Sequence, residues 1–160
     1  MRTISIESNG RIEKTAVYLN GEQITGIKEL LLSIDEEGIF NAIISFTSSS
    51  GTLLTKQLFT DDLSQLQRRE AAFSEDEAMD LRSMAIESDG TLDNTSVFMN
   101  NEFIDGIVSI MVHIMIDSVQ KRENVFTKIF SKNQSYSETR FISEIVLRNP
   151  DGSESIESIF

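Results

Sequence analysis

Two segments of this chain, one in each half, have closely similar sequences. When the chain is aligned with itself at an offset of 80, Arg2–Ile27 falls on Arg82–Ile107 without a gap, and 12 of the 26 pairs are identical. The identical pairs are Arg2/Arg82, Ile6/Ile86, Glu7/Glu87, Ser8/Ser88, Gly10/Gly90, Thr15/Thr95, Val17/Val97, Asn20/Asn100, Glu22/Glu102, Ile24/Ile104, Gly26/Gly106 and Ile27/Ile107. A tandem duplication explains this similarity, so we expect the two halves to share a fold.

The repeated segment has the pattern of short β-strands joined by tight turns. Apolar residues alternate with polar ones on both sides of Asn20-Gly21, a strong signal for a two-residue hairpin turn. Gly10 and Gly90 each close a turn where a residue without Cβ can adopt positive φ. Most identical pairs therefore have structural explanations. For Arg2/Arg82 and Glu7/Glu87 we favour ion pairing at strand ends over a functional pair.

The rest of each half continues the strand pattern, although the two sequences diverge. In the second half, a connection over Asp117–Asn124 precedes a strand over Val125–Ser131, a turn over Lys132–Ser135 and a strand over Thr139–Leu147. Asn149–Gly152 is a turn, and Ser153–Phe160 either adds a strand or frays. The prediction is an all-β fold with two sandwich-like or partly open barrel units, each with about five antiparallel strands.

The two predicted units are residues 1–60 and 81–160, and residues 61–80 form an acidic, helical linker between them. Leu63, Leu66 and Phe73 lie roughly on one helical face, and Ser74–Glu77 matches a capping box. A unit of this size would bury only about 60% of its unfolded surface, so we expect the two units to pack around a pseudo-two-fold axis.

Composition and charge limit the chemistry. The chain has no Cys and one His, which leaves no thiolate nucleophile and no Cys-based zinc site, and no His spacing typical of a metal site occurs. His113 is expected to be a strand residue with an ordinary hydrogen bond. The sequence therefore predicts no catalytic, metal or cofactor site and no enzymatic activity. A carboxylate-only glycoside hydrolase is the one enzyme class left open.

A net charge of −12 is spread over both halves. It disfavours direct contact with nucleic acid or anionic lipid, and it favours basic protein partners. The sequence offers one candidate protein-binding site, the acids of the linker: Asp61, Asp62, Glu75, Asp76 and Glu77. The alternative is that the charge only keeps the protein soluble.

The segments Ile4–Gly10 and Val17–Ile27 resemble small β-rich proteins of unassigned function encoded by bacterial viruses and prophages. The resemblance covers the first third of each unit, and the second unit departs from it at Asn101. It implies a mobile-element origin and no catalytic residue.

Together these features predict a non-enzymatic protein-binding or assembly protein, either a virion component or an adaptor, with possible self-association. The alternative is an acidic inhibitor of a basic, nucleic-acid-binding bacterial protein: an anti-defence protein (anti-CRISPR-like or nucleic-acid-mimicking) or an immunity protein. No apolar run reaches the ~18 residues that span a bilayer. We therefore expect a soluble protein in the bacterial cytoplasm or the virion, with no membrane contact.

Overall fold

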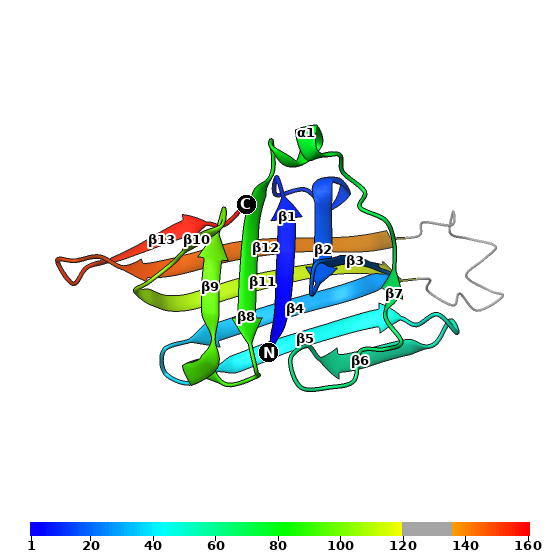
Figure 1. Cartoon of the computed structure of the whole chain (residues 1–160), viewed down its shortest axis with the longest axis horizontal. Helices are drawn as coiled ribbons and strands as arrows, with labels where there is room; N and C mark the ends of the chain where they lie inside the picture. Colours follow the sequence, from blue (N-terminus) through cyan, green and yellow to red (C-terminus); the bar gives the residue numbers. More distant parts are fainter. Residues whose placement is uncertain (120–135) are drawn as a thin grey trace, which may run out of the picture.

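Two antiparallel sheets packed against each other form the protein, as the computed structural model shows for residues 1–119 and 136–160 (Figure 1). The strands of one sheet cross those of the other at a steep angle, the arrangement of an orthogonal β-sandwich. The all-β prediction is confirmed.

The seven-stranded sheet has the order β10-β9-β8-β1-β2-β3-β7, and the six-stranded sheet has the order β13-β12-β11-β4-β5-β6. The strands of the first sheet are β1 (Arg2–Ser8), β2 (Thr15–Leu19), β3 (Glu22–Thr25), β7 (Gln67–Arg68), β8 (Arg82–Ser88), β9 (Ser96–Met99) and β10 (Glu102–Phe103). Those of the second are β4 (Ile27–Asp35), β5 (Phe40–Thr47), β6 (Leu53–Gln57), β11 (Ile107–Val119), β12 (Tyr136–Arg148) and β13 (Glu154–Ser158). The helical elements are the 3₁₀ turns η1 (Ile12–Lys14) and η2 (Leu92–Asn94) and the helix α1 (Glu75–Ala78).

The two central strand pairs relate the halves by a pseudo-two-fold axis, as the sequence predicts. β1 pairs with β8, and in their register Ser5 lies opposite Ala85, its own equivalent in the second half. β4 pairs with β11, and Leu32 likewise lies opposite its equivalent Val112. An antiparallel pair in which a residue faces its own equivalent has a local two-fold axis at that point. The axis therefore passes through the middle of both sheets.

Residues from these central strands form the core. Alternation along each strand directs every second side chain between the sheets. The fully or almost fully buried side chains at the centre are Ile4, Ile6, Leu30, Leu32, Met84, Ile86, Ile110 and Val112.

The equivalence of the halves continues to the end of the chain with a larger offset. Phe40 packs against Phe59 with ring centroids 5.8 Å apart, and Phe141 packs against Phe160 at 6.2 Å. The backbone bond from Leu58 N–H to the Ala42 carbonyl likewise corresponds to the bond from Ile159 to Ser143. Equivalent positions after this hairpin are 101 residues apart in the sequence, whereas those before it are 80 apart. The connection from β11 to β12 is therefore longer than the connection from β4 to β5.

The residues that are identical in both halves make the same local bonds. The buried Ser8 hydroxyl lies 2.7 Å from the Thr15 hydroxyl and accepts from Gly10 N–H, and Ser88 makes the corresponding bonds to Thr95 and Gly90. In each half an asparagine in a turn is tied to the neighbouring strand: the side-chain oxygens of Asn20 and Asn100 accept from the backbone N–H groups of Thr3 on β1 and Ser83 on β8. Both asparagines have positive φ, near 50°. The shared polar positions are thus explained by turn geometry, and the duplication itself stays a prediction from sequence.

The prediction of two separate units joined by a linker is wrong. In the described residues, 1–60 and 81–160 contribute six strands each rather than about five, three to each sheet, and β7 is a further strand between them, so the halves together form one sandwich. Residues 1–60 alone would leave the outer edges of β1 and β4 without hydrogen-bond partners, and the second half supplies them.

The prediction of a helical linker over 61–80 holds only at α1, where Ser74 and Glu77 form the expected capping box. Leu63 and Leu66 are buried, but in extended and turn structure, because Gln67–Arg68 pairs with β3 instead of continuing a helix. Tertiary pairing has overridden a helical spacing of apolar residues.

In the second half, the strand over Thr139–Leu147, the turn over Asn149–Gly152 and a final strand within Ser153–Phe160 are confirmed. β11 extends to Val119, so residues 117–119 are strand rather than connection. The predicted strand over Val125–Ser131 and turn over Lys132–Ser135 lie outside the described residues.

Truncation of a side chain on the axis should destabilise the whole sandwich. We expect Leu32→Ala to lower the free energy of unfolding by about 2–5 kcal/mol, because Leu32 is fully buried. Leu53→Ala is the control, since Leu53 is 64% exposed, and its effect should stay within about 0.5 kcal/mol. Urea denaturation measures both, and a loss below about 1 kcal/mol for Leu32→Ala would contradict this account of the core.

Candidate functional site

The predicted acidic site in the linker is not a single cluster. The Asp61 carboxylate accepts a hydrogen bond from Gln57 N–H at 2.8 Å, just after β6. The Asp62 carboxylate accepts from both the backbone and the hydroxyl of Ser64, and these bonds lower the pKa of Asp62. Both side chains therefore stabilise a local turn.

The other three predicted acids belong to α1. The Glu77 carboxylate accepts from Ser74 N–H at 2.9 Å, and this bond and that of the Ser74 hydroxyl lower the pKa of Glu77. Glu75 and Asp76 stand in the first turn of the same helix, where a negative charge is favourable. Within the described ranges, no three His, Asp or Glu side chains come together as metal ligands would.

The expected ion pairing of the shared residues Arg2 and Glu7 is wrong. Arg2 donates to the Leu58 carbonyl at 2.8 Å, and this bond ties the start of β1 to the residue that follows β6. Glu7 accepts from the Tyr18 hydroxyl at 2.9 Å instead of pairing with an arginine.

His113 has the ordinary strand environment that the sequence suggests. It lies on β11, and its Nε2 is 2.7 Å from Glu29 Oε1 on the neighbouring strand β4. The contact joins the two central strands on the face of the six-stranded sheet opposite the core side chains Leu30 and Val112.

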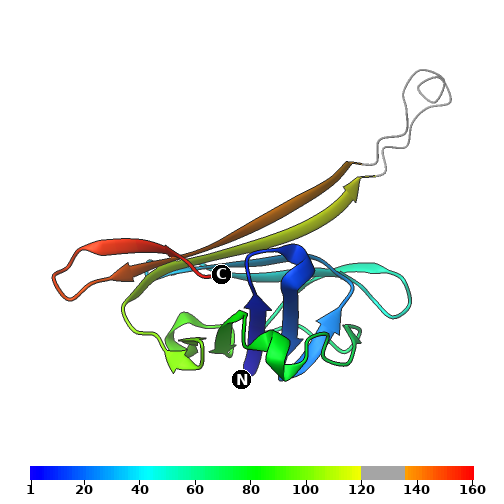
Figure 2. The same ribbon diagram turned by 90° about the horizontal axis from the view of Figure 1, so that it is seen from above.

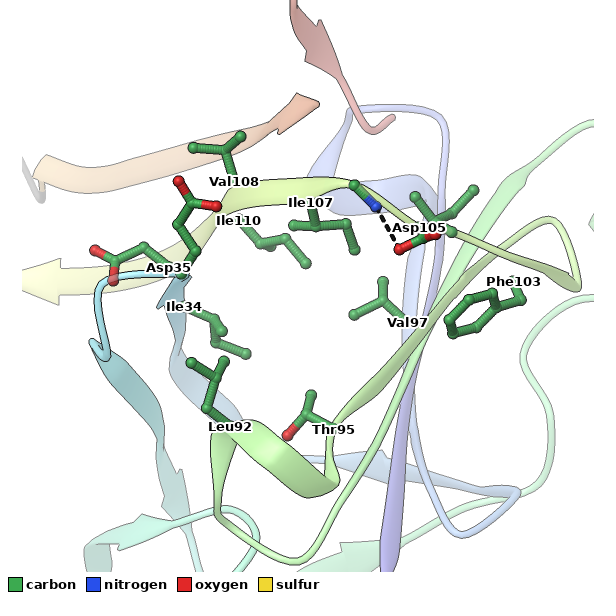
Figure 3. A pocket seen from close by; sticks show the side chains of 13 residues that line it. Ile34, Asp35, Leu92, Thr95, Val97, Phe103, Asp105, Ile107, Val108 and Ile110 are labelled. Atoms are coloured by element: carbon green, nitrogen blue, oxygen red, sulfur yellow. Dashed lines mark hydrogen bonds between the residues drawn. The ribbon is translucent and has the colours of Figure 1, made fainter. Parts of the chain in front are cut away.

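A large hollow beside the symmetric core lies in the second half, between the two sheets (Figure 3). It has a volume of about 360 Å³. Its walls are largely apolar and come from both halves: Ile34, Leu92, Val97, Ile107 and Ile110. Its rim carries three carboxylates, of Asp35, Glu36 and Asp105. We call this hollow the open pocket.

The acids on the rim are fixed by hydrogen bonds. Asp35 accepts from two backbone N–H groups of the turn that follows β4, and Asp105 accepts from Gly106 N–H at 2.8 Å. The two terminal guanidinium nitrogens of Arg148 donate to the Glu36 carboxylate, and these bonds lower the pKa of Glu36 and keep it charged. The rim thus holds the carboxylates of Asp35 and Asp105 and a Glu36–Arg148 ion pair beside an apolar wall.

The first half has an equivalent hollow, the closed pocket, that is half as large. Ten of its lining residues fall on lining residues of the open pocket at the offset of 80, from Ile12/Leu92 to Leu30/Ile110, yet its volume is only about 180 Å³. Arg69 lines the closed pocket, and it comes from the segment that follows β7. At the positions of Asp105 and Val108 the closed pocket has Thr25 and Lys28, so the two pockets differ in charge.

Residues 67–72 cover this side of the first half (Figure 1, at the β7 label). Arg69 N–H donates to the Gln23 carbonyl at 3.0 Å, and Ala72 N–H donates to the Gln23 side chain at 2.6 Å. The Gln67 side chain donates to the carbonyls of Thr47 and Ser48, on the opposite sheet, at 2.9 and 3.0 Å. The segment thus ties the two sheets together at this edge.

An ion pair adds to this contact. The Arg68 guanidinium lies 2.5 Å from the Glu22 carboxylate on β3. Glu22 is one of the few acids shared by both halves, and Glu102 is its equivalent on β10. Among the described residues, no basic side chain pairs with Glu102 and no strand pairs with the outer side of β10.

Sequence reasoning missed this pair of sites. It found Glu22/Glu102 among the identical pairs but gave them no partner, and it assigned Gln67–Arg69 to a helical linker. The signal was present in the alignment of the halves, where the buried Gln23 is replaced by Phe103 and Thr25 by Asp105. A buried polar residue replaced by an exposed aromatic one indicates that the two sites have different covers.

Within the described residues, the fold and the site define an all-β sandwich protein in which one sheet edge is covered by a further strand and the pseudo-symmetric edge is not. In comparisons with protein-family models, with curated proteins and with solved structures, no match to this chain was found. No described helix is long and apolar enough to cross a bilayer.

The contact between Tyr18 and Glu7 predicts an unusual titration beside the covering segment. Burial first, then the hydrogen bond to the Glu7 carboxylate and its charge, raise the pKa of Tyr18 to about 12. Because the unfolded state releases this proton near pH 10, the contribution to stability is complete below pH ~10 and is lost as the pH rises towards 12.

Ultraviolet titration of the wild type, with Tyr18→Phe subtracted, should show this ionisation. Glu7→Gln should shift it part of the way down, since burial remains. A Tyr18 that ionises near pH 10 in the folded protein would contradict the contact.

Proposed function

We propose that this protein is a non-enzymatic protein-binding or assembly protein of a bacterial virus or another mobile element, and that it joins other subunits by pairing of β-strand edges. The observation that carries the proposal is the hairpin of β11 and β12, which extends beyond the body of the sandwich (Figure 2).

The described part of this hairpin has two unpaired edges. β11 and β12 pair with each other as far as Val119 and Tyr136. On one side, β4 pairs with β11 only as far as Met115. On the other side, β13 pairs with β12 only from Glu144 onward. Residues 136–142 of β12 therefore pair with no described strand on the side away from β11.

An isolated two-stranded hairpin is only marginally stable in water, and an exposed strand edge is a template for pairing with another chain. A hairpin that extends past its own sheet is therefore suited to add to a sheet of another subunit. Strand addition supplies affinity through backbone hydrogen bonds and requires no catalytic group.

The exposed N–H groups of this edge can be identified from the register. The Ser143 carbonyl accepts from Ile159 N–H, so the backbone groups of Ser143 point away from β11. Because direction alternates along a strand, those of Thr139 point the same way, whereas those of Arg140 bond to β11.

A proline at position 139 tests the proposal. Thr139→Pro removes one N–H donor from the unpaired edge and leaves the ladder to β11 intact, so it should abolish assembly without unfolding the protein. Thr139→Val keeps the donor and is the matched control. Sedimentation velocity over a wide concentration range should show oligomers for the wild type and Thr139→Val and monomers for Thr139→Pro. Monomeric wild-type protein at every concentration would contradict self-assembly.

The acidic rim of the open pocket favours a second candidate, the acidic inhibitor of a basic, nucleic-acid-binding bacterial protein. Such a complex should weaken strongly with salt, because screening acts on exposed charges. Capture from host lysate at low and high salt tests it. Salt-sensitive capture of a nucleic-acid-binding protein by monomeric Thr139→Pro would favour the inhibitor over the assembly protein.

A further inference from the structure

We propose that the outer edge of β10, together with the open pocket, binds an extended segment of a partner protein that carries two consecutive basic residues. This inference rests on the proposed protein-binding function and deepens it by assigning a second site. In the first half of the chain, the segment that contains β7 occupies the equivalent edge of β3.

The backbone of the second half is already arranged as in the occupied half. In the first half Ile24 pairs with Val17 of β2, and in the second half Ile104 N–H donates to the Val97 carbonyl at 2.9 Å. β3 extends to Thr25 because β7 pairs with it, and β10 ends at Phe103, where no described strand continues the pairing. An added strand would find the same edge in the same position.

Comparison of β10 with β3 also shows which backbone N–H and C=O groups of β10 point away from β9. Arg69 N–H donates to the Gln23 carbonyl, so the groups of Gln23 face outward to the added strand. Phe103 is the equivalent of Gln23, and its backbone groups face the uncovered side. A partner residue placed as Arg69 is would donate to the Phe103 carbonyl.

Side-chain chemistry identifies the occupant as basic. Glu102 stands where Glu22 binds Arg68, so a cation at that position of the partner would pair with Glu102. The next residue of the partner would take the place of Arg69, which lines the closed pocket. In the open pocket no described side chain takes that position, the volume is twice as large, and Asp105, which forms no ion pair among the described residues, stands at the rim.

An apolar surface beside this edge is also uncovered. Phe103 is 61% exposed and packs edge-on against Phe98, with ring centroids 5.9 Å apart, whereas Gln23 in the occupied half is 6% exposed. In the first half Ala72 and its neighbours cover Gln23. The continuation of a partner segment would cover the two phenylalanines in the same way.

A second copy of this chain is a poorer occupant than another protein. To supply its own Gln67–Arg69, that copy would have to withdraw Leu63 and Leu66, which are each 4% exposed in its core. Exposure of buried leucines opposes such an exchange strongly. A partner with an extended dibasic segment that is not already bound meets no such cost.

The test uses the full-length chain and a synthetic peptide with the sequence of residues 61–72, which contains the segment that occupies the first half. In titration calorimetry the peptide should bind one site per chain, and the affinity should fall as salt is raised. Replacement of both arginines of the peptide by glutamine should lower the affinity about tenfold or more.

Two matched pairs locate the site. Glu102→Gln in the protein should weaken peptide binding about two- to fivefold, as expected for an exposed ion pair, and Glu22→Gln should leave it unchanged. An N-methyl group on the peptide nitrogen of Arg69 should weaken binding at least about tenfold, because it removes the N–H that meets Phe103. The same group on Arg68 faces away from β10 and should have little effect.

Each remaining outcome overturns the inference in a defined way. If no peptide binds, the edge of β10 is not a binding site. The assembly function is tested separately, by the sedimentation of Thr139→Pro. If Glu22→Gln alone changes the affinity, the peptide exchanges with the in-chain segment. If the glutamine peptide binds equally well, the occupant is not basic, and if the peptide dissociates wild-type oligomers, the occupant is a second copy of the chain.

Discussion

The antiparallel pairing of β1 with β8 and of β4 with β11 is the interaction on which the rest of the structure depends. Each pair joins one half of the chain to the other at the centre of a sheet. Without these two ladders, each half is two small sheets whose apolar faces are too small for a core of their own. With them, Ile4, Leu32, Ile86 and Val112 become the fully buried middle of a single sandwich.

The places where the two halves differ hold both candidate binding features. The first difference is the longer hairpin of β11 and β12, which leaves the shared sheet and extends outward. The second is the segment Gln67–Arg68, which completes one edge of the first half and has no described counterpart at β10. Symmetric positions are occupied by buried side chains and turn residues, so binding to other proteins would use the asymmetric ones.

Features of the fold that depend on residues close together in the sequence could be predicted, and features that depend on residues far apart could not. Turns at Gly10 and Asn20, the capping box at Ser74 and the strand character of most segments depend on neighbours along the chain, and the sequence predicts them. The pairing between halves depends on residues far apart along the chain, so the symmetry could be expected but the shared sheets could not. Gln67–Arg68 resembled part of a helix because Leu63 and Leu66 have helical spacing, and only the edge of β3 explains its extended form. The open pocket lies between elements of both halves, and no local pattern indicates it.

The sharing of both sheets between the halves also has a consequence for synthesis on the ribosome. When only the first half of the chain has emerged, β1 and β4 each have one edge without a partner, and those partners, β8 and β11, have not yet been made. Contacts between residues so far apart in sequence form slowly, and unpaired edges attract other chains. The nascent protein therefore passes through an interval in which its own missing half and a neighbouring nascent copy compete for the same two edges, and the speed of translation through residues 81–119 sets how long that interval lasts.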